Sequence, residues 1–302
     1  MVAGMSGFRE QVLQLGPARG LVAVATHPST APLVSRPAIV ILNAGIVHRV
    51  GPNRLHVELA RRLAIEGHVV VRLDLSGIGD SARRRESLAP LEAVIADIRE
   101  ALDSLQTGLG LQQVILLGLC SGADHAVIYA GADTRVAGIV LLDPNIPRTA
   151  GYYFFYYGKR LWKFESWGNL FTGRHPVWKR LRSQGRPRSG NSAHEAPDMP
   201  DIVPQSPGGP NQPEVRAFLT EAYARTVAGG CQMLVVLAGA QEGQHSYRRQ
   251  LLHAFPTVPF GSQLRLEYMQ NADHTFEAEF CRSELFELIA GWLNATQFPV
   301  RK

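Results

Sequence analysis

The sequence predicts an α/β protein with a mostly parallel, doubly wound sheet and an inserted cap. Three observations favour this class. Apolar runs typical of buried strands alternate with segments of helical periodicity along most of the 302 residues. One of these runs ends in Gly118 to Gly122, a Gly-x-Cys-x-Gly sequence. The alternation stops at Pro147 and resumes at Gln232, so the residues between them form an insertion.

The chain begins with a predicted β-hairpin over Glu10 to Ala25, because two strand-like segments flank the turn-rich residues 16–20. Continuous apolar runs then indicate strands that are covered on both faces. Leu55, Leu59 and Leu63 recur at the spacing of one helix face. The further predicted elements are strands over 37–42, 69–73, 114–119, 136–142, 232–237 and 264–268, and helices over 55–64, 88–105, 124–130, 213–227 and 279–293.

The insertion differs in composition from the rest of the chain. Residues 152–178 are rich in Tyr, Phe and Trp, and Lys and Arg outnumber acids over 159–188. Residues 183–213 are rich in Pro, Gly and Ser and predict a loop with little secondary structure. We therefore expect a core of residues 1–147 and 230–302, with a cap insertion over 148–229.

Bulk composition narrows the functional class. Hydrophobic residues make up 45% of the chain and charged residues 19%, as in an ordinary soluble protein with a large core. No apolar stretch approaches the ~18 residues of a membrane span, and the N-terminus lacks a secretion signal. The three cysteines show no metal-ligand spacing, so we expect a cytoplasmic protein without metal or cofactor.

The Gly118 to Gly122 sequence has the pattern of a nucleophile elbow, a sharp strand-to-helix turn that exposes its central residue. Flanking glycines are needed because the turn leaves no room for side chains, and the central residue is expected to be strained. Centring the turn on Ser121 would place Leu119 where a small residue is required. Cys120 is therefore the predicted nucleophile, although a free cysteine is often only a small buried hydrophobic residue.

His274 is the predicted general base, because it follows the last strand in a polar loop. A neutral imidazole there can take the thiol proton and later return it to a leaving group or activate water. A surface histidine without a catalytic role is the alternative.

Four segments together resemble the α/β-hydrolase fold: residues 43–45, 74–81, 118–122 and 271–276. More narrowly, the chain resembles the bacterial hydrolases described as exosortase A system-associated, and serine aminopeptidase-type hydrolases. That group is similar in the cysteine at the elbow, in an Arg-x-Gly-x-x-Arg stretch (Arg49 to Arg54) and in a cap segment like Trp167 to Gly173. Here Ser121 follows the cysteine, where the group often has Asp.

The resemblance implies a third catalytic residue, an acid that orients the histidine. It should follow the strand that ends at Leu237, where Glu242 is the acidic residue present. Related sequences more often have Asp there. Some α/β-hydrolases take the acid from the preceding strand, which makes Asp143 the alternative to Glu242.

The oxyanion hole is expected from backbone N–H groups of Ser121 and of the loop that contains Gly45 and Ile46. His48 lies in the same loop and either contacts substrate or faces solvent. Asp74 and the glycine-punctuated loop that follows it, over 76–81, are expected to hold the sheet edge in shape.

The cap is expected to close over Cys120 and form an apolar acyl pocket beneath a cationic rim. Arg49, Trp162 and Trp167, together with His48, are the predicted substrate contacts. Such a site suits an acyl group carried by coenzyme A or by an acidic carrier protein. Nucleic acid is not an expected partner, because the insertion contains no recognised binding motif.

Three functions remain open from the sequence. The first is hydrolysis of a thioester or activated ester through an acyl-Cys120 intermediate. The second is transfer of that acyl group to an alcohol or amine. The third is a non-catalytic binding module that retains the hydrolase frame.

Overall fold

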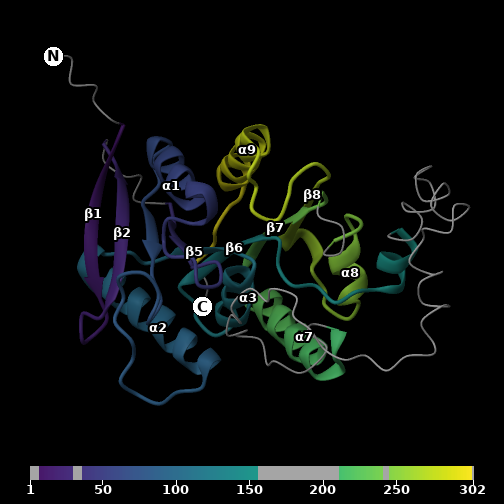
Figure 1. Ribbon diagram of the computed structural model, residues 1–302, viewed down its shortest axis with the longest axis horizontal. Coiled ribbons are helices and arrows are strands. Elements are labelled where there is room, and N and C mark those ends of the chain that lie inside the picture. The colour runs from purple at the N-terminus through teal and green to yellow at the C-terminus, as the bar shows by residue number, and fades with distance from the viewer. Residues whose placement is uncertain (1–6, 30–35, 156–210, 241–244, 301–302) are drawn as a thin grey trace, which may run out of the picture.

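Eight strands in the described residues form one mixed sheet with the order β1-β2-β4-β3-β5-β6-β7-β8 (Figure 1). The computed structural model describes residues 7–29, 36–155, 211–240 and 245–300. The β1–β2 and β2–β4 pairs are antiparallel, and every other pair is parallel. The strands are Phe8–Leu15 (β1), Leu21–Pro28 (β2), Ala38–Ile41 (β3), Val70–Leu73 (β4), Val114–Leu119 (β5), Val136–Leu142 (β6), Gln232–Ala238 (β7) and Leu264–Met269 (β8). The predicted doubly wound sheet is confirmed.

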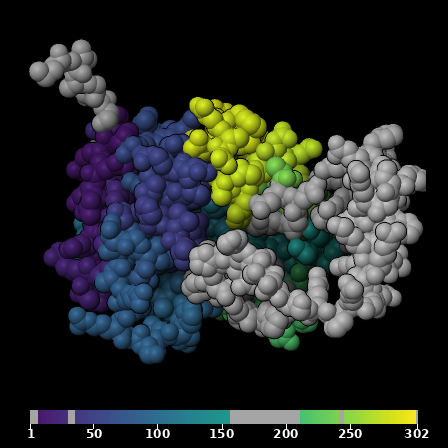
Figure 2. Space-filling model, viewed as in Figure 1, coloured from purple at the N-terminus to yellow at the C-terminus, as the bar shows by residue number. Residues whose placement is uncertain are grey.

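Helices cover both faces of this sheet (Figure 1). Helices α1 (Leu55–Ile65) and α9 (Glu279–Ala295) lie on one face, beside each other in Figure 2. Helices α2 (Pro90–Leu109), α3 (Ser121–Ala130) and α7 (Pro213–Ala228) lie on the other. Two buried apolar clusters, one on each face, match these layers. The central strands read as unbroken apolar runs because they are covered on both sides.

Residues 150–155 are also helical. The described residues contain further, shorter helical segments. They are η1 (Pro52–Arg54), α8 (Gln250–Ala254) and η3 (Gly261–Gln263). The sequence analysis did not predict α8, since a five-residue helix is too short to show helical periodicity.

Helix α7, which lies within the predicted insertion, packs against α3. Its apolar residues belong to the same buried cluster as those of α3. The Thr226 hydroxyl donates to the Val127 carbonyl at 3.1 Å and fixes α7 against α3. Helix α7 is therefore part of the layer that covers the sheet, within the residues 148–229 expected as the insertion.

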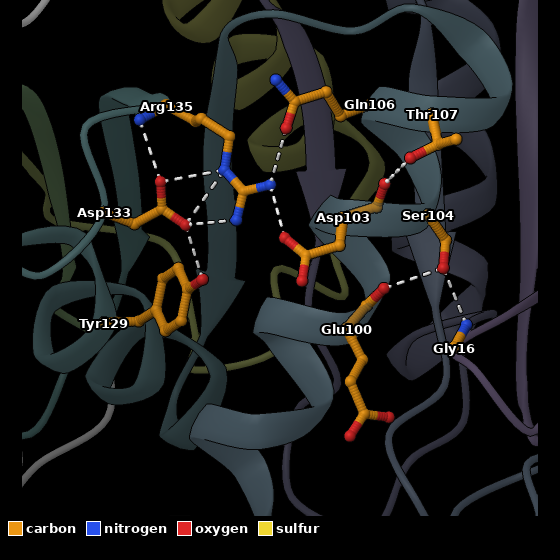
Figure 3. Close-up of polar contacts among 9 residues, drawn as sticks. All are labelled: Gly16, Glu100, Asp103, Ser104, Gln106, Thr107, Tyr129, Asp133 and Arg135. Carbon is orange, nitrogen blue, oxygen red and sulfur yellow. Dashed lines mark hydrogen bonds and ion pairs between the residues drawn. The ribbon is translucent and has the colours of Figure 1, made fainter.

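A polar network at the end of α3 ties three elements together (Figure 3). Arg135, just before β6, binds Asp133 through Nη2 at 2.7 Å and Asp103 of α2 through Nη1 at 2.7 Å. The Tyr129 hydroxyl of α3 donates to Asp133 Oδ2 at 2.6 Å. Hydrogen bonds to charged partners are stronger than neutral ones. This network therefore helps to fix the positions of α2 and α3 relative to the start of β6.

In the part of the chain that the structure describes, no helix combines the length and the apolar character needed to cross a membrane.

Candidate active site

The turn between β5 and α3 places Cys120 in a strained backbone conformation. Its φ and ψ are 55° and −123°, values that a residue with a side chain rarely adopts. A Cβ atom at Gly118 would lie 2.1 Å from the Gly122 carbonyl, and one at Gly122 would lie 2.4 Å from the Asn43 carbonyl oxygen. Both predictions about this turn, strain at its centre and obligatory glycines around it, are confirmed. Cys120 is half-buried and directly precedes the first residue of α3.

His274 lies between Cys120 and an acid. Its Nδ1 hydrogen-bonds to Oδ2 of Asp143, and its side chain also contacts Cys120. These three residues follow β8, β5 and β6, whose carboxyl ends meet at one edge of the sheet. A thiol, an imidazole and a carboxylate thus follow one another as the members of a catalytic triad do in other enzymes.

The carboxylate is the alternative acid, Asp143, and not the preferred one. Asp143 is 1% exposed, and its backbone is held at a φ of 49°. Its Oδ1 also accepts the Ala238 N–H at 2.9 Å. Glu242 lies outside the described residues. The preference for Glu242 rested on its position after β7, whereas His274 contacts the residue that follows β6.

Charge in this group is arranged to keep the histidine protonated. Hydrogen bonds to Asp143 and Cys120 outweigh burial and raise the pKa of His274 to about 10. Burial by itself would raise the pKa of Asp143, but hydrogen bonds from His245 and His274 hold it below its usual range. The arrangement therefore favours an imidazolium beside the Asp143 carboxylate.

The loop of Asp143 is tied to the elbow helix. Both the backbone N–H and the side-chain amide of Asn145 donate to Asp124 of α3, at 3.1 and 2.5 Å. Burial raises the pKa of Asp124 to about 7, although these donors oppose the shift. The bonds connect the segment that holds Asp143 to the helix that directly follows Cys120.

The loop after β3 lies against the elbow. The Gly45 N–H donates to the Ser121 hydroxyl oxygen at 2.8 Å. This bond engages the Gly45 amide, so Ile46 is the residue of the predicted pair whose N–H is left for a substrate oxygen. The Asn43 side chain donates to the Val47 carbonyl at 3.0 Å and accepts the Leu75 N–H at 2.7 Å, which fixes the loop to the segment after β4.

Arg49, a predicted substrate contact, makes structural contacts in this arrangement. Its guanidinium binds Asp74 and Asp80, both at 2.5 Å, and its backbone N–H donates to Asp74 at 2.6 Å. A guanidinium held by two carboxylates does not offer a free charge to a substrate. The Asp74 carboxylate is fully buried, in agreement with the structural role expected for it.

His48 is exposed in the same loop. It lies against the loop after Asp74, since a Cβ added at Gly79 would be 2.9 Å from the Cβ of His48. Trp162 and Trp167, the other predicted substrate contacts, lie outside the described residues.

His245, beside Asp143, is not among the residues predicted from the sequence. Nε2 of His245, in the segment after β7, lies 3.1 Å from Asp143 Oδ1. His245 lies in the segment after β7, where an acid was expected. The sequence therefore indicated this segment but not a histidine in it.

Comparison with known proteins agrees with this fold. Residues 37–224, more than half of the chain, match the family described as alpha/beta hydrolase fold. The protein belongs to the α/β-hydrolase family. No curated protein sequence matches the chain.

Solved structures resemble it along nearly the whole length. An alpha-beta serine hydrolase homologue from Coxiella burnetii is 16% identical, with a TM-score of 0.53 over 95% of this chain and 97% of its own. A hypothetical protein from Pseudomonas aeruginosa is 16% identical, with a TM-score of 0.57 over 96% and 94%. An esterase from Pyrococcus furiosus is 13% identical, with a TM-score of 0.56 over 95% and 91%. At these identities the likeness concerns the fold.

Proposed function

We propose that this α/β-hydrolase cleaves thioesters or activated esters through an acyl-Cys120 intermediate. The observation that carries the proposal is the contact of His274 with both Cys120 and Asp143 at a strained elbow. A thiolate is the reactive form of cysteine, and a neighbouring imidazolium stabilises it.

In the first half of the reaction, the Cys120 thiolate attacks the acyl carbonyl carbon. The resulting oxyanion accepts hydrogen bonds from the N–H groups of Ser121 and Ile46. The bond to the leaving group breaks, and the His274 imidazolium gives its proton to the departing thiolate or alkoxide.

In the second half, His274 is neutral and takes a proton from water as the water oxygen attacks the acyl-Cys120 carbonyl. Collapse of this second oxyanion breaks the carbon–sulfur bond. The acid is released, and the Cys120 thiolate and the His274 imidazolium are restored. Asp143 holds the imidazole orientation and offsets its charge throughout.

The same intermediate also permits transfer to an alcohol or amine in place of water, which is the second candidate activity. A non-catalytic module would need no such contact between a thiol, an imidazole and a buried carboxylate. We propose His48, on the exposed rim of the loop after β3, as a substrate contact, and residues from 148 to the start of α7 as the cap. We also propose the acyl donor to be a coenzyme A or carrier-protein thioester.

The test is intact-mass analysis after incubation with a panel of acyl-CoA and acyl-pantetheine thioesters. An acyl adduct on the wild type and on Cys231→Ala, absent from Cys120→Ala, is the expected result. Release of free acid indicates hydrolysis, and an acylated acceptor indicates transfer. If no adduct forms, no substrate is turned over and Cys120 is not rapidly alkylated, both catalytic proposals are wrong. The protein would then be a non-catalytic binding module.

A further inference from the structure

Asp143, the carboxylate that binds His274, has a strained backbone conformation. Its φ of 49° lies in the left-handed region, which a residue with a side chain adopts at a cost in free energy. Such a conformation persists only where the surrounding structure holds it. The Asp143 N–H donates to the Val236 carbonyl at 2.8 Å, and the Ala238 N–H donates to Asp143 Oδ1 at 2.9 Å. These bonds hold Asp143 from the side of β7, and the chain that follows it needs a support of its own.

The chain after Asp143 is held by Asp124, in the first turn of α3. The Asn145 N–H donates to Asp124 Oδ1 at 3.1 Å, and the Asn145 side-chain amide donates to Asp124 Oδ2 at 2.5 Å. Both oxygens of the Asp124 carboxylate therefore hold the same residue. Pro144 lies between Asp143 and Asn145, and its ring restricts φ. A displacement of Asn145 is therefore passed to Asp143 and not absorbed in the chain between them.

Asp124 also connects this chain to the elbow. Its backbone N–H donates to the Cys120 carbonyl at 3.2 Å, which places the carboxylate one helical turn from the cysteine. An acidic side chain in the first turn of a helix commonly interacts with the N–H groups of its own helix end. The hydrogen bonds that the Asp124 side chain accepts within the described residues come from Asn145. One residue thus links the elbow to the backbone that carries Asp143.

Stability alone does not explain a carboxylate at this position. Asp124 is 1% exposed, and its removal from water opposes the gain from its hydrogen bonds. Burial raises the pKa of Asp124 even though both Asn145 donors lower it. The negative charge of Asp124 also acts on the buried Tyr223 of α7, whose pKa is raised first by burial and then by that charge. An apolar side chain would avoid these costs, so the gain from the carboxylate is the fixed position of Asn145.

We propose that Asp124 is a positioning residue for the triad: through Asn145 it holds Asp143 in its strained conformation and keeps Oδ2 directed at His274. The hydrogen bonds and the strain are features of the structure, whereas the effect on catalysis rests on the proposed function. Asp124 takes no part in the chemistry and acts through Asn145 and Asp143 alone.

The pKa of His274 reports the position of Asp143, because the hydrogen bond to Asp143 is the largest cause of its rise to about 10. Asp124→Asn replaces one acceptor oxygen by an N–H group that faces a donor of Asn145. Asn145→Ala removes the side-chain donor without any change of charge. In each variant we expect the pKa of His274 to fall by at least about one unit, a roughly tenfold weaker affinity for the proton. Nitrogen-15 spectra of histidine-labelled protein, titrated from about pH 5 to about pH 11 and assigned with His274→Gln, measure this pKa.

The rescue is the exchanged pair, Asp124→Asn combined with Asn145→Asp. The amide at position 124 then donates to a carboxylate at position 145 and accepts the N–H of that residue. The pKa of His274 should return to within about half a unit of the wild-type value. Asp133→Asn, beyond the far end of α3, is the control. It weakens bonds to Arg135 and so lowers stability, but it should leave the pKa of His274 within the same limit.

An unmoved His274 pKa in either single variant would overturn the proposal, and so would a fall that the exchanged pair does not reverse or that Asp133→Asn reproduces. If Asp124→Asn does not fold, Asn145→Ala decides by the same titration, since Asn145 is only half-buried. The titration needs no substrate. A protein without thioester turnover that still shows the fall and the rescue would refute the proposed function and keep the role of Asp124. Turnover with an unmoved pKa would refute the role of Asp124 alone.

Discussion

His274 and Asp143 are 131 residues apart in the chain, and the Nδ1–H of the first donates to Oδ2 of the second. The bond joins the loop after β8 to the loop after β6 across the end of the intervening strand β7. It brings a carboxylate of low exposure to a histidine that also contacts the elbow cysteine. Every proposed chemical step depends on this pair.

Replacing the acid tests which carboxylate belongs to the triad. We expect Asp143→Asn to lower the rate of Cys120 acylation at least ~100-fold. The neutral amide does not offset the positive charge of an imidazolium, and only its oxygen can accept a hydrogen bond. Glu242→Gln should retain the wild-type rate within about threefold. Stopped-flow acylation with a chromogenic thioester measures both, and the reverse pattern would restore Glu242 as the acid.

The elbow glycines predict a sharp steric penalty. Gly118→Ala would place Cβ 2.1 Å from the Gly122 carbonyl, which is part of the backbone and cannot rotate away. We expect the free energy of unfolding to fall by at least about 3 kcal/mol. Gly108→Ala in α2 is the control, because nothing lies within 4 Å of its Cβ. That change should stabilise the protein by up to about 1 kcal/mol. Similar denaturant midpoints for the two variants would contradict this account of the turn.

Ser121→Ala separates the two roles that this residue has in the structure. Removing the hydroxyl leaves the Ser121 N–H in place but deprives the Gly45 N–H of its acceptor. The loop with Ile46 then loses its tie to the elbow. We expect kcat to fall about tenfold with KM little changed, since an oxyanion contact acts in the transition state. The acyl adduct should still form on Cys120, and its loss would point instead to Ser121 as the nucleophile.

Buried neutral histidines make the fold sensitive to acid. Burial, and then the nearby charge of Arg72, lower the pKa of His56 to about 4. In the unfolded chain this ring binds a proton near pH 6.5. Between these values the unfolded state binds more protons, so the free energy of unfolding falls as the pH falls, by up to about 3 kcal/mol for His56.

Urea unfolding at pH 7, 6 and 5 measures this slope. His68 and His125 act in the same direction, because burial lowers the pKa of each to about 4. We expect His56→Leu to flatten the slope, whereas the exposed His253→Gln should leave it as in the wild type. A slope that is unchanged in His56→Leu would rule out this assignment.

The network of Figure 3 predicts a stability effect remote from the site. Arg135→Met removes bonds to Asp133 and Asp103 and leaves the half-buried Asp133 with fewer donors. We expect a loss of about 1–2 kcal/mol in unfolding free energy. Arg265→Met, which removes an exposed pair with Glu267, should cost less than about 0.5 kcal/mol. Equal losses in thermal unfolding would show that burial of the network has no effect.

Local patterns made most of the fold predictable. The apolar run of β5, buried at every position, lacks the polar alternation of a strand with one exposed face. The elbow was predictable because its constraint is steric and acts over five residues. That α7 packs with α3 in the layer over the sheet could not be predicted, because an amphipathic helix has the same sequence pattern whether it covers a sheet or a cap.

The sequence by itself determined the order of strands and helices and the position of the elbow, since these follow from periodicity and from the size of neighbouring residues. The choice of Cys120 over Ser121 as nucleophile stays a prediction from the sequence. Tertiary structure alone decided that Asp143 faces both His274 and His245. It alone decided that Arg49 forms ion pairs with Asp74 and Asp80. The physical reason is distance along the chain. Loops after adjacent parallel strands meet only when the sheet forms, and a hydrogen bond depends on where side chains lie in space.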